Sequence, residues 1–287
     1  MEQPLTNQPI GVFDSGYGGL TILREIVQQL PQYDYVYLGD NARTPYGTRS
    51  FETVYQYTLQ CVKLLFDRGC RLVIVACNTA SAKALRNIQQ LDLPRLYPGR
   101  TDARLDGPDR RVLGVIRPTT EVIGNYSETG EVGIMATRGT VSSESYLVEI
   151  EKFFPDVRVY QEACPMWVPL IENGEYDSPG ADYFVQQHIA RLMAQSPNID
   201  TLLLACTHYP LLIDKIRQYV PETITILSQG GIVANSLAEY LHRHPELDAQ
   251  CSKNGKRQFL TTDSTDDFDR QATVFYGQAV RSEHQGL

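Results

Sequence analysis

Short apolar runs that alternate with helical patterns constrain this chain more than any other feature. The clearest run, Leu72–Ala76, reads L-V-I-V-A and is rich in β-branched residues. A strand that is buried on both faces of a parallel sheet has this composition. The run ends abruptly at Cys77, and small polar residues follow it. Because ligands of open α/β sheets bind at the carboxyl ends of the strands, we expect Cys77 to lie where chemistry takes place.

The same arrangement returns in the second half of the chain. Thr201–Ala205 is another short apolar run, and Cys206 follows it directly, ahead of T-H-Y-P. The first half also begins with an apolar run, Ile10–Phe13, which leads into the turn D-S-G-Y-G-G and then a helical pattern. These strand–turn–helix units predict an α/β fold with parallel sheets.

Length and recurring motifs indicate two related units. At 287 residues, the chain is long enough for about two domains. Gly11 recurs as Gly133 and Cys77 recurs as Cys206, at offsets of 122 and 129 residues (133 − 11 and 206 − 77). We therefore expect two pseudo-symmetric, doubly wound α/β domains with the active site in the cleft between them. The predicted boundaries are 1–98 plus 209–287 for a discontinuous first domain and 99–208 for the second.

Composition narrows the class of protein and its location. The formal net charge of −8 argues against a general binder of nucleic acid or of anionic membranes. The first residues lack the pattern of a signal peptide, and no apolar run approaches the roughly 20 residues of a membrane span. The six cysteines are spread without a C-x-x-C pair, so we expect reduced thiols. We predict a cytoplasmic protein with no nucleic-acid or membrane partner.

The remaining strands are predicted from similar apolar runs, and two stretches look irregular. Residues 94–111 are rich in Pro, Gly, Asp and Arg, and we expect a solvated surface connection there. We expect the tail beyond Ser282 to be disordered. The other predicted strands are 35–38, 112–116, 132–136, 157–160, 223–227 and 259–261.

The turn from Asp14 to Gly19 has more than one reading. A glycine-rich turn between a strand and a helix can bind phosphate, but this one is not G-x-G-x-x-G. A carboxylate at Asp14 would also repel phosphate. It suits an ammonium group or the orientation of a catalytic side chain. The plainer alternative is that the glycines only make a tight turn.

Two cysteines across one cleft suggest proton transfer at a carbon centre. A cysteine nucleophile works with a histidine, which would leave the second cysteine idle. Pyridoxal chemistry needs a Schiff-base lysine, and Lys83, the one lysine near the motifs, lies well inside a predicted helix. Metal binding is poorly supported, because His208 alone among the histidines adjoins a candidate ligand. Thiols, with a pKa of about 8.5, suit reversible proton exchange. We expect no metal and no cofactor.

Four motifs carry a resemblance to a known family. The chain resembles glutamate racemases, of the cofactor-independent aspartate/glutamate racemase superfamily, in G-V-F-D-S-G-Y-G-G-L, Y-L-G-D-N-A-R-T-P-Y-G, A-C-N-T-A-S-A and A-C-T-H-Y-P-L-L. The resemblance runs from Ile10 to about Leu212 and continues more faintly beyond. It implies an amino-acid racemase that acts on glutamate, forms a homodimer and supplies D-glutamate for peptidoglycan. The stretch 99–111 looks longer than in the typical member, and Tyr17 replaces a smaller residue.

The resemblance also assigns site residues. It implies catalytic thiols at Cys77 and Cys206, with Asp14 as partner of the first and His208, supported by Glu172, as partner of the second. It implies substrate contacts at Asp14, Ser15, Tyr46, Gly47, Asn78, Thr79, Thr207 and His208.

The mechanism that we expect is a two-base proton transfer. One thiolate removes the α-proton while the opposite thiol protonates the other face, and the family implies that Cys77 acts on D-glutamate and Cys206 on L-glutamate. Two alternatives remain open. One is an aspartate racemase or a related amino-acid racemase of the same superfamily. The other is a non-catalytic amino-acid-binding protein on this fold, although binding alone would need neither thiol.

Overall fold

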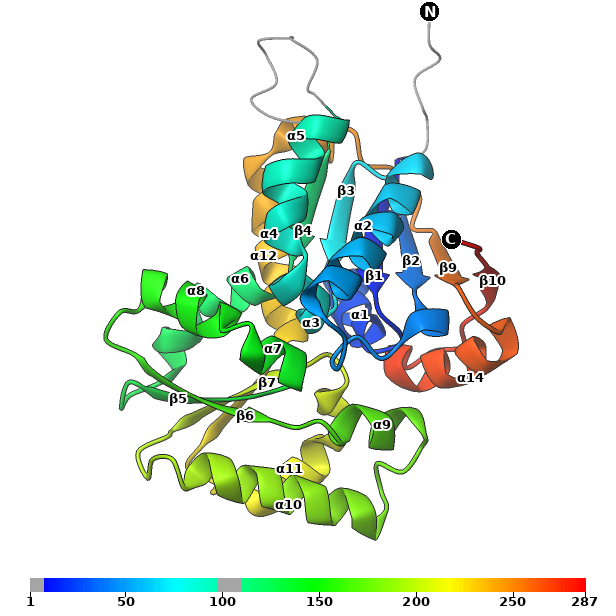
Figure 1. Cartoon of the computed structure of the whole chain (residues 1–287). Coiled ribbons are helices and arrows are strands. Elements are labelled where there is room, and N and C mark those ends of the chain that lie inside the picture. The colour runs from blue at the N-terminus through cyan, green and yellow to red at the C-terminus, as the bar shows by residue number, and fades with distance from the viewer. Residues whose placement is uncertain (1–7, 98–109) are drawn as a thin grey trace, which may run out of the picture.

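The computed structural model describes residues 8–97 and 110–287, and it divides the strands between two parallel sheets (Figure 1). The larger sheet has the order β10-β9-β2-β1-β3-β4, and the smaller has the order β6-β5-β7-β8. The larger sheet contains β1 (Ile10–Asp14), β2 (Tyr35–Gly39), β3 (Leu72–Val75), β4 (Arg111–Gly114), β9 (Arg257–Thr261) and β10 (Ser282–His284). The smaller sheet contains β5 (Glu131–Ala136), β6 (Arg158–Ala163), β7 (Thr201–Ala205) and β8 (Thr225–Ser228).

Helices cover the sheets and join their strands, as the predicted α/β class requires (Figure 1). The longer ones, of nine residues or more, are α1 (Gly19–Gln29), α2 (Phe51–Asp67), α8 (Ser145–Phe153), α10 (Pro179–Met193), α12 (Gln229–Arg243) and α14 (Thr265–Tyr276). The shorter ones are α3 (Asn78–Lys83), α4 (Leu85–Asn87), α5 (Leu93–Leu96), α6 (Ile116–Thr120), α7 (Arg138–Ser142), α9 (Trp167–Glu172), α11 (Ile213–Tyr219) and α13 (Pro245–Asp248). No helix within the described residues combines the length and hydropathy needed to cross a bilayer.

The two sheets repeat one topology. In each, four strands take the order second, first, third, fourth along the chain: β2-β1-β3-β4 and β6-β5-β7-β8. Gly11 pairs with Val73 of β3, and Gly133 pairs with Leu202 of β7. Each cysteine stands four residues after that partner (77 − 73 and 206 − 202), so the two thiols occupy equivalent strand ends. The prediction of two pseudo-symmetric α/β units is confirmed.

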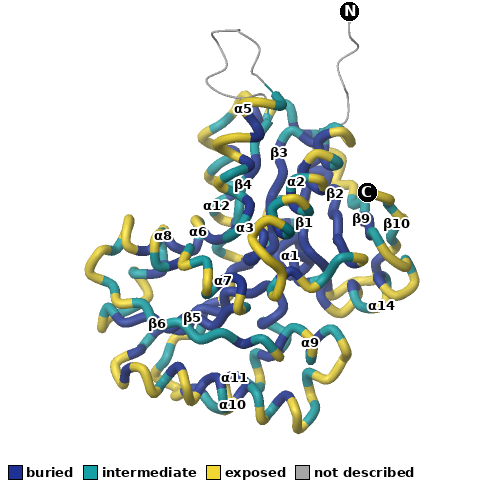
Figure 2. The backbone as a smooth tube through the Cα atoms, in the orientation of Figure 1, coloured by how far each residue is buried: buried dark blue, intermediate teal, exposed yellow. Residues whose placement is uncertain are grey.

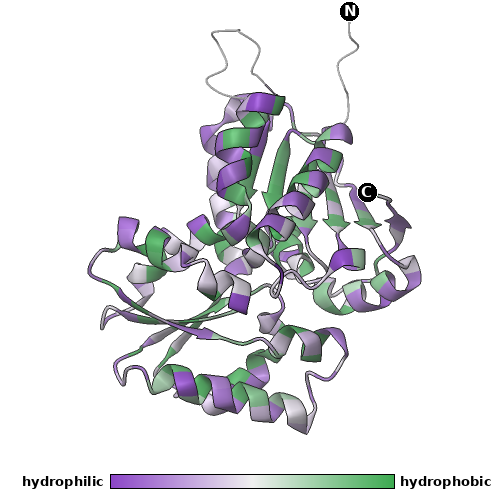
Figure 3. Cartoon of the chain, viewed as in Figure 1, coloured by the Kyte–Doolittle hydropathy of each residue, from purple (hydrophilic) through white to green (hydrophobic). Residues whose placement is uncertain are grey.

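The central strands β1, β3, β5 and β7 are buried along their whole length. Successive side chains of a strand point to opposite faces of its sheet, so these strands are packed on both faces. Leu72 and Ile74 of β3 belong to one apolar cluster, whereas Val73 and Val75 belong to another, which includes the inner face of α2. The first cluster also contains Leu204 of β7, so one core runs through both lobes. Figure 2 shows the central strands buried beneath exposed helix surfaces, and Figure 3 shows the same strands as hydrophobic.

Sheet pairing differs from the predicted domain boundaries at two edge strands. The boundaries assign residues 111–114 to the second domain, but β4 pairs with β3 of the larger sheet. They assign residues 225–228 to the first domain, but β8 pairs with β7 of the smaller sheet. An apolar run carries no signal of the sheet that it joins, so edge strands are the easiest to misassign. The chain therefore crosses between the lobes after β4 and again after β8.

Two local predictions are also corrected. Residues 282–284 are not disordered but form β10, which pairs with β9. Two hydrogen bonds of 2.8 Å fix this strand: the backbone N–H of Ser282 donates to Asp269 Oδ1, and that of Gln285 donates to the carbonyl oxygen of Thr261. The predicted connection over residues 94–111 begins within helix α5 and ends within β4. Its central part, residues 98–109, lies outside the described residues. The predicted strand over 112–116 is likewise shifted, because α6 begins at Ile116.

Candidate active site

A small cavity of about 60 Å³ lies where the carboxyl ends of β1, β3 and β7 converge. It draws residues from both lobes, as the sequence predicted. All the predicted site residues other than Glu172 line it: Asp14, Ser15, Tyr46, Gly47, Cys77, Asn78, Thr79, Cys206, Thr207 and His208. The pseudo-symmetry of the sheets explains the arrangement, because it brings the two equivalent strand ends to one cleft.

Cys77 lies between the end of β3 and the start of α3. Its Sγ is 3.3 Å from Ser15 Oγ and accepts a hydrogen bond from the backbone N–H of Ala80 at 3.4 Å. Burial, with a contribution from the nearby Asp14 carboxylate, raises the pKa of the Cys77 thiol to about 12. Cys77 is therefore protonated at neutral pH and is available as a proton donor.

Asp14 ends β1 and is buried beside Cys77. Its Oδ2 accepts a hydrogen bond from the backbone N–H of Gly16 at 2.9 Å. Its Oδ1 is buried and has no hydrogen-bond partner within the described residues. Burial raises the pKa of Asp14, and the charge of His208 opposes that rise. A buried carboxylate oxygen without a donor is costly, so this atom suits a donor that a ligand would bring.

His208 links Cys206 to Glu172. Its Nδ1 lies 3.9 Å from Cys206 Sγ, a long contact, and its Nε2 lies 3.0 Å from Glu172 Oε1. Burial by itself would lower the pKa of His208, but the hydrogen bonds to Cys206 and Glu172 raise it well above its ordinary value. The two hydrogen bonds therefore favour the cationic form of the ring. A cation beside a cysteine stabilises negative charge on the sulfur.

The glycine turn of residues 14–19 makes room for that histidine. A Cβ on Gly18 would lie 2.3 Å from His208 Nδ1 and 2.4 Å from Thr207 Oγ1. Its φ of −58° is open to any residue, so the glycine supplies space and not an unusual backbone. The glycines therefore do more than make a tight turn, and the task predicted for the Asp14 carboxylate stays a prediction.

Helix α14 closes one side of the His208–Glu172 pair, which the sequence did not predict. The ring of Phe275 meets His208 edge-on, with centroids 5.1 Å apart, and Tyr17 stacks on Phe275 at 5.9 Å. Gln271 Nε2 donates to the backbone carbonyl of Glu172 at 3.1 Å. An aromatic helix face carries no catalytic signature, so only its packing in the fold reveals this role.

Two of the predicted contact residues have their polar groups engaged elsewhere. The Tyr46 hydroxyl donates a hydrogen bond to Asp40, so its proton is already engaged. The Gly47 carbonyl accepts from the backbone N–H of Gly139 at 3.0 Å. The hydroxyl of Thr79 is also hydrogen-bonded, to Thr137 Oγ1 at 2.9 Å, and both threonines line the cavity.

Thr137 is a cavity residue that the sequence analysis missed. It follows β5 as Ser15 follows β1, at the offset of 122 residues that relates Gly11 to Gly133 (137 − 15). The internal repeat was therefore the signal that would have found it.

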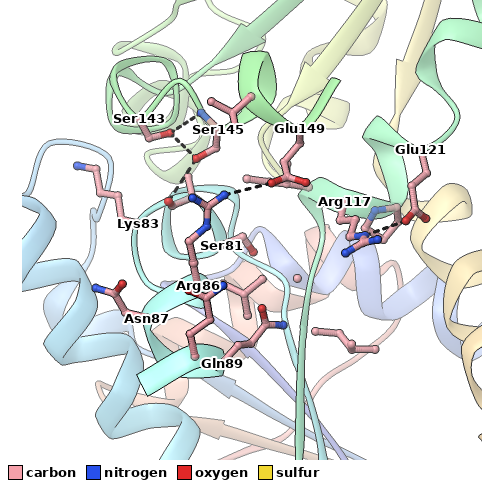
Figure 4. A pocket seen from close by; sticks show the side chains of 18 of the residues that line it. Ser81, Lys83, Arg86, Asn87, Gln89, Arg117, Glu121, Ser143, Ser145 and Glu149 are labelled. Atoms are coloured by element: carbon pink, nitrogen blue, oxygen red, sulfur yellow. Dashed lines mark hydrogen bonds and ion pairs between the residues drawn. The ribbon is translucent and has the colours of Figure 1, made fainter. Parts of the chain in front are cut away.

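A second, larger cavity of about 900 Å³ lies between the lobes but contains neither thiol. Figure 4 shows charged side chains around it that pair with each other. Arg86 lies 3.3 Å from Glu149 and Arg117 lies 2.8 Å from Glu121. Size alone would favour this cavity, but both strand-end thiols lie in the smaller one, together with Asp14 and His208, whose pKa values are shifted by their surroundings. We therefore assign the chemistry to the smaller cavity.

The chemistry available in the smaller cavity is that of acids and bases. All six cysteines are free. Among residues 8–97 and 110–287, no group of three or more His, Cys, Asp or Glu side chains has the arrangement of a metal site. What the cavity offers is two buried thiols, each beside its own charged partner.

Comparisons with known proteins agree with this arrangement. The family model for Asp/Glu/Hydantoin racemases matches residues 10–235. A glutamate racemase from Geobacter metallireducens is 38% identical over 277 residues, which cover 96% of this chain and 95% of the relative. One from Streptococcus suis is 34% identical and covers 99% and 100% of the two chains.

Solved structures give the same result. Glutamate racemase isoform RacE1 from Bacillus anthracis superposes with a TM-score of 0.85 at 32% identity, covering 98% of each chain. Glutamate racemase from Francisella tularensis, in complex with D-glutamate, has a TM-score of 0.82 at 30% identity and covers 99% of this chain and 98% of its own. An aspartate racemase from Picrophilus torridus, at 17% identity and a TM-score of 0.53, shares only the fold. The chain therefore belongs to the Asp/Glu/Hydantoin racemase family and is an amino-acid racemase.

Proposed function

We propose that this enzyme interconverts L-glutamate and D-glutamate by proton transfer between two bases, Cys77 and Cys206. One observation carries the proposal: two buried thiols, at equivalent ends of two related sheets, line a single cavity. An α-carbon held between them meets one thiol on each face. Removing a proton from one face and returning one to the other inverts the centre.

Glutamate is the substrate because the relatives covering nearly all of this chain carry that name, and the one from Francisella tularensis is in complex with D-glutamate. The unpaired Oδ1 of Asp14 suits the α-ammonium group. Hydroxyl and amide groups on the cavity wall, with backbone N–H groups, suit the carboxylates and the charge that develops during proton transfer. These polar side chains are Ser15, Asn78, Thr79 and Thr207.

The step from L-glutamate to D-glutamate begins at Cys206. Its thiolate, stabilised by the cationic His208, takes the α-proton, and the electron pair of the C–H bond stays on the α-carbon. The thiol of Cys77 then gives its proton to the opposite face. One turnover leaves Cys206 protonated and Cys77 as a thiolate, and proton exchange with water resets both. In the reverse direction Cys77 is the base.

The charged partners have different tasks. Glu172 fixes the His208 ring through Nε2, which leaves Nδ1 for Cys206. Asp14 lies beside Cys77 and opposes a lasting thiolate there, so that sulfur returns readily to the thiol form. Neither role needs a metal or an organic cofactor.

The cellular setting of the proposal follows from the family. The product would be D-glutamate for peptidoglycan synthesis in the cytoplasm. We also propose that the enzyme acts as a homodimer, without nucleic-acid or membrane partners. Sedimentation velocity over a range of concentrations would test the dimer, and a single species of monomer mass at all concentrations would contradict it.

A circular-dichroism assay of the purified protein with L-glutamate tests the function directly. The optical signal should decay to zero without added cofactor. The rate of this decay should be unchanged by EDTA and by hydroxylamine. L-aspartate should be a poor substrate. Activity that is lost with hydroxylamine and restored by pyridoxal phosphate would contradict cofactor independence. Faster turnover of L-aspartate would favour the aspartate racemase, and binding without turnover would favour an amino-acid-binding protein.

A further inference from the structure

A closed ring of hydrogen bonds joins three buried side chains, those of Asn78, Tyr146 and Gln229. Asn78 Nδ2 donates to Gln229 Oε1 at 2.6 Å, and Gln229 Nε2 donates to the Tyr146 hydroxyl at 2.9 Å. The Tyr146 hydroxyl in turn donates to Asn78 Oδ1 at 2.7 Å. All three residues are at most 2% exposed. Ring members with no access to water depend on one another for their hydrogen bonds.

One backbone carbonyl fixes the direction of the whole ring. Gln229 also approaches the carbonyl oxygen of Val115, at 3.0 Å, and a carbonyl can only accept. The Gln229 atom that faces it must therefore be Nε2, which leaves Oε1 toward Asn78. The Asn78 atom that meets Oε1 must then be Nδ2, and its Oδ1 must accept from Tyr146. Burial raises the pKa of Tyr146, so its hydroxyl keeps the proton that this bond needs.

The ring lies where the two lobes are joined. Asn78 begins α3, immediately after Cys77 of the larger-sheet lobe, whereas Tyr146 lies on α8 of the smaller-sheet lobe. Gln229 begins α12 and Val115 precedes α6, and these are the two places where the chain crosses between the sheets. The orientation of one cavity amide thus depends on both lobes and on both crossings.

Asn78 also lines the cavity that contains the thiols. Its amide nitrogen has two hydrogens, and the bond to Gln229 uses one of them. A flipped amide would turn its carbonyl oxygen to the position of that nitrogen, where it would repel a substrate carboxylate and could donate nothing.

We propose that Tyr146 and Gln229 are positioning residues, which hold the Asn78 amide so that its second N–H, and never its carbonyl, is offered to a carboxylate of the substrate. The inference rests on the proposed contact between Asn78 and glutamate. It extends that proposal to two side chains that do not touch the substrate and that no motif in the sequence marks.

Tyr146→Phe removes one hydroxyl and opens the ring with little change in shape. We expect KM for both enantiomers to rise about tenfold, the usual effect of one lost hydrogen bond to a charged group, while kcat changes by less than about threefold. Gln229→Met, which removes the other bonds, should show the same split. Tyr55→Phe is the matched control. The Tyr55 hydroxyl also donates a partly buried hydrogen bond, to Asp92 at 2.7 Å, but it does not line the cavity, so this variant should leave KM unchanged.

A double-mutant cycle separates positioning from a general loss of packing. If Tyr146 acts through the amide, Tyr146→Phe should raise KM in the wild-type background but not in an Asn78→Ala background. An equal rise in both backgrounds, or an unchanged KM in folded Tyr146→Phe and Gln229→Met enzymes, would overturn the inference. The Cys77→Ser variant in the same assay keeps the two proposals apart: its full activity would overturn the two-thiol mechanism, whatever KM the Tyr146 variant shows.

Discussion

His208 is held at both ring nitrogens, and this fixes what its loss should do. In the proposed mechanism the ring stabilises the thiolate of Cys206, the base for L-glutamate, and its two nitrogens face Cys206 and Glu172. His208→Asn should therefore lower kcat by roughly a hundredfold from L-glutamate and by clearly less from D-glutamate. Initial rates in both directions, measured by circular dichroism, check this expectation.

A thermodynamic constraint gives that experiment an internal test. The enantiomers have equal free energies in water, so kcat/KM must be the same in both directions for every variant. If kcat falls more from L-glutamate than from D-glutamate, the KM for L-glutamate must fall relative to the KM for D-glutamate by the same factor. His188→Asn is the control, because His188 is also buried but lies on α10 against Trp167. Equal losses of kcat in both directions, with a lower melting temperature, would assign His208 a structural role instead.

Gly18 leaves the space that the His208 ring occupies. A methyl group there would overlap His208 Nδ1 and displace the ring, since the built Cβ lies only 2.3 Å away. Gly18→Ala should lower kcat about a hundredfold, the usual effect of displacing a catalytic group by about 1 Å. Gly231→Ala in α12 is the matched control, because nothing lies within 4 Å of its Cβ. The control should keep full activity, and a fully active Gly18→Ala enzyme would show that His208 does not need this space.

Without the family resemblance, the site residues that the sequence pattern could predict are those at the end of an apolar strand. Asp14, Cys77 and Cys206 are of this kind, and their chemistry is visible in the residue type. Phe275, Tyr146 and Gln229 could not be predicted, because they reach the site from helices distant in the sequence and their residue types are common in ordinary cores. Their roles exist only once the lobes are packed together.

At the scale of elements, Asp34 connects the start of β2 to the loop before β9. It accepts hydrogen bonds from the backbone N–H groups of Asn254 and Lys256 at 3.1 and 2.7 Å, and from Asn254 Nδ2 at 2.7 Å. Burial by itself would raise the pKa of Asp34, but these hydrogen bonds lower it below its ordinary value. The charged form is therefore the one that the fold stabilises.

This arrangement predicts a pH-dependent loss of stability. Because the pKa of Asp34 is lower in the folded state, its stabilisation is present above the unfolded pKa of about 3.9 and is lost as the pH falls through the folded value. Asp34→Asn should lower the free energy of unfolding at neutral pH by about 1–3 kcal/mol, and the difference should shrink in acid. Urea unfolding at several pH values measures it. Exposed Asp156→Asn is the control, and a difference that grows in acid would contradict the account.

The central strands of both sheets were predictable, because runs buried on two faces are continuous and apolar. The edges were not. β10 consists of three polar or charged residues, S-E-H, and is fixed by backbone hydrogen bonds to its neighbours, which a hydropathy pattern cannot reveal. The start of α6 within the predicted strand over 112–116 is a similar case, because Val115 and Ile116 are apolar in either conformation.

The architecture of the whole molecule was predicted better by the internal repeat of motifs than by the proposed domain boundaries. Matching Gly11 with Gly133 and Cys77 with Cys206 predicted two related sheets and a shared cleft, and the strand orders agree. The predicted boundaries fail at β4 and β8, because the choice of sheet for an edge strand depends on long-range pairing. The same long-range packing forms the cleft. In the proposed mechanism each lobe therefore supplies one thiol to the same α-carbon.

Isotope labelling distinguishes proton transfer by two thiols from proton transfer by a single base. The reaction should be run from L-glutamate in deuterated water and stopped at low conversion, and both enantiomers should then be separated and analysed by mass spectrometry. If Cys206 removes the proton and Cys77, already exchanged with solvent, protonates the other face, D-glutamate carries deuterium at the α-carbon and recovered L-glutamate is almost unlabelled. Early D-glutamate that retains the original hydrogen would show that a single base serves both faces, and it would contradict the pairing of Cys77 with Cys206.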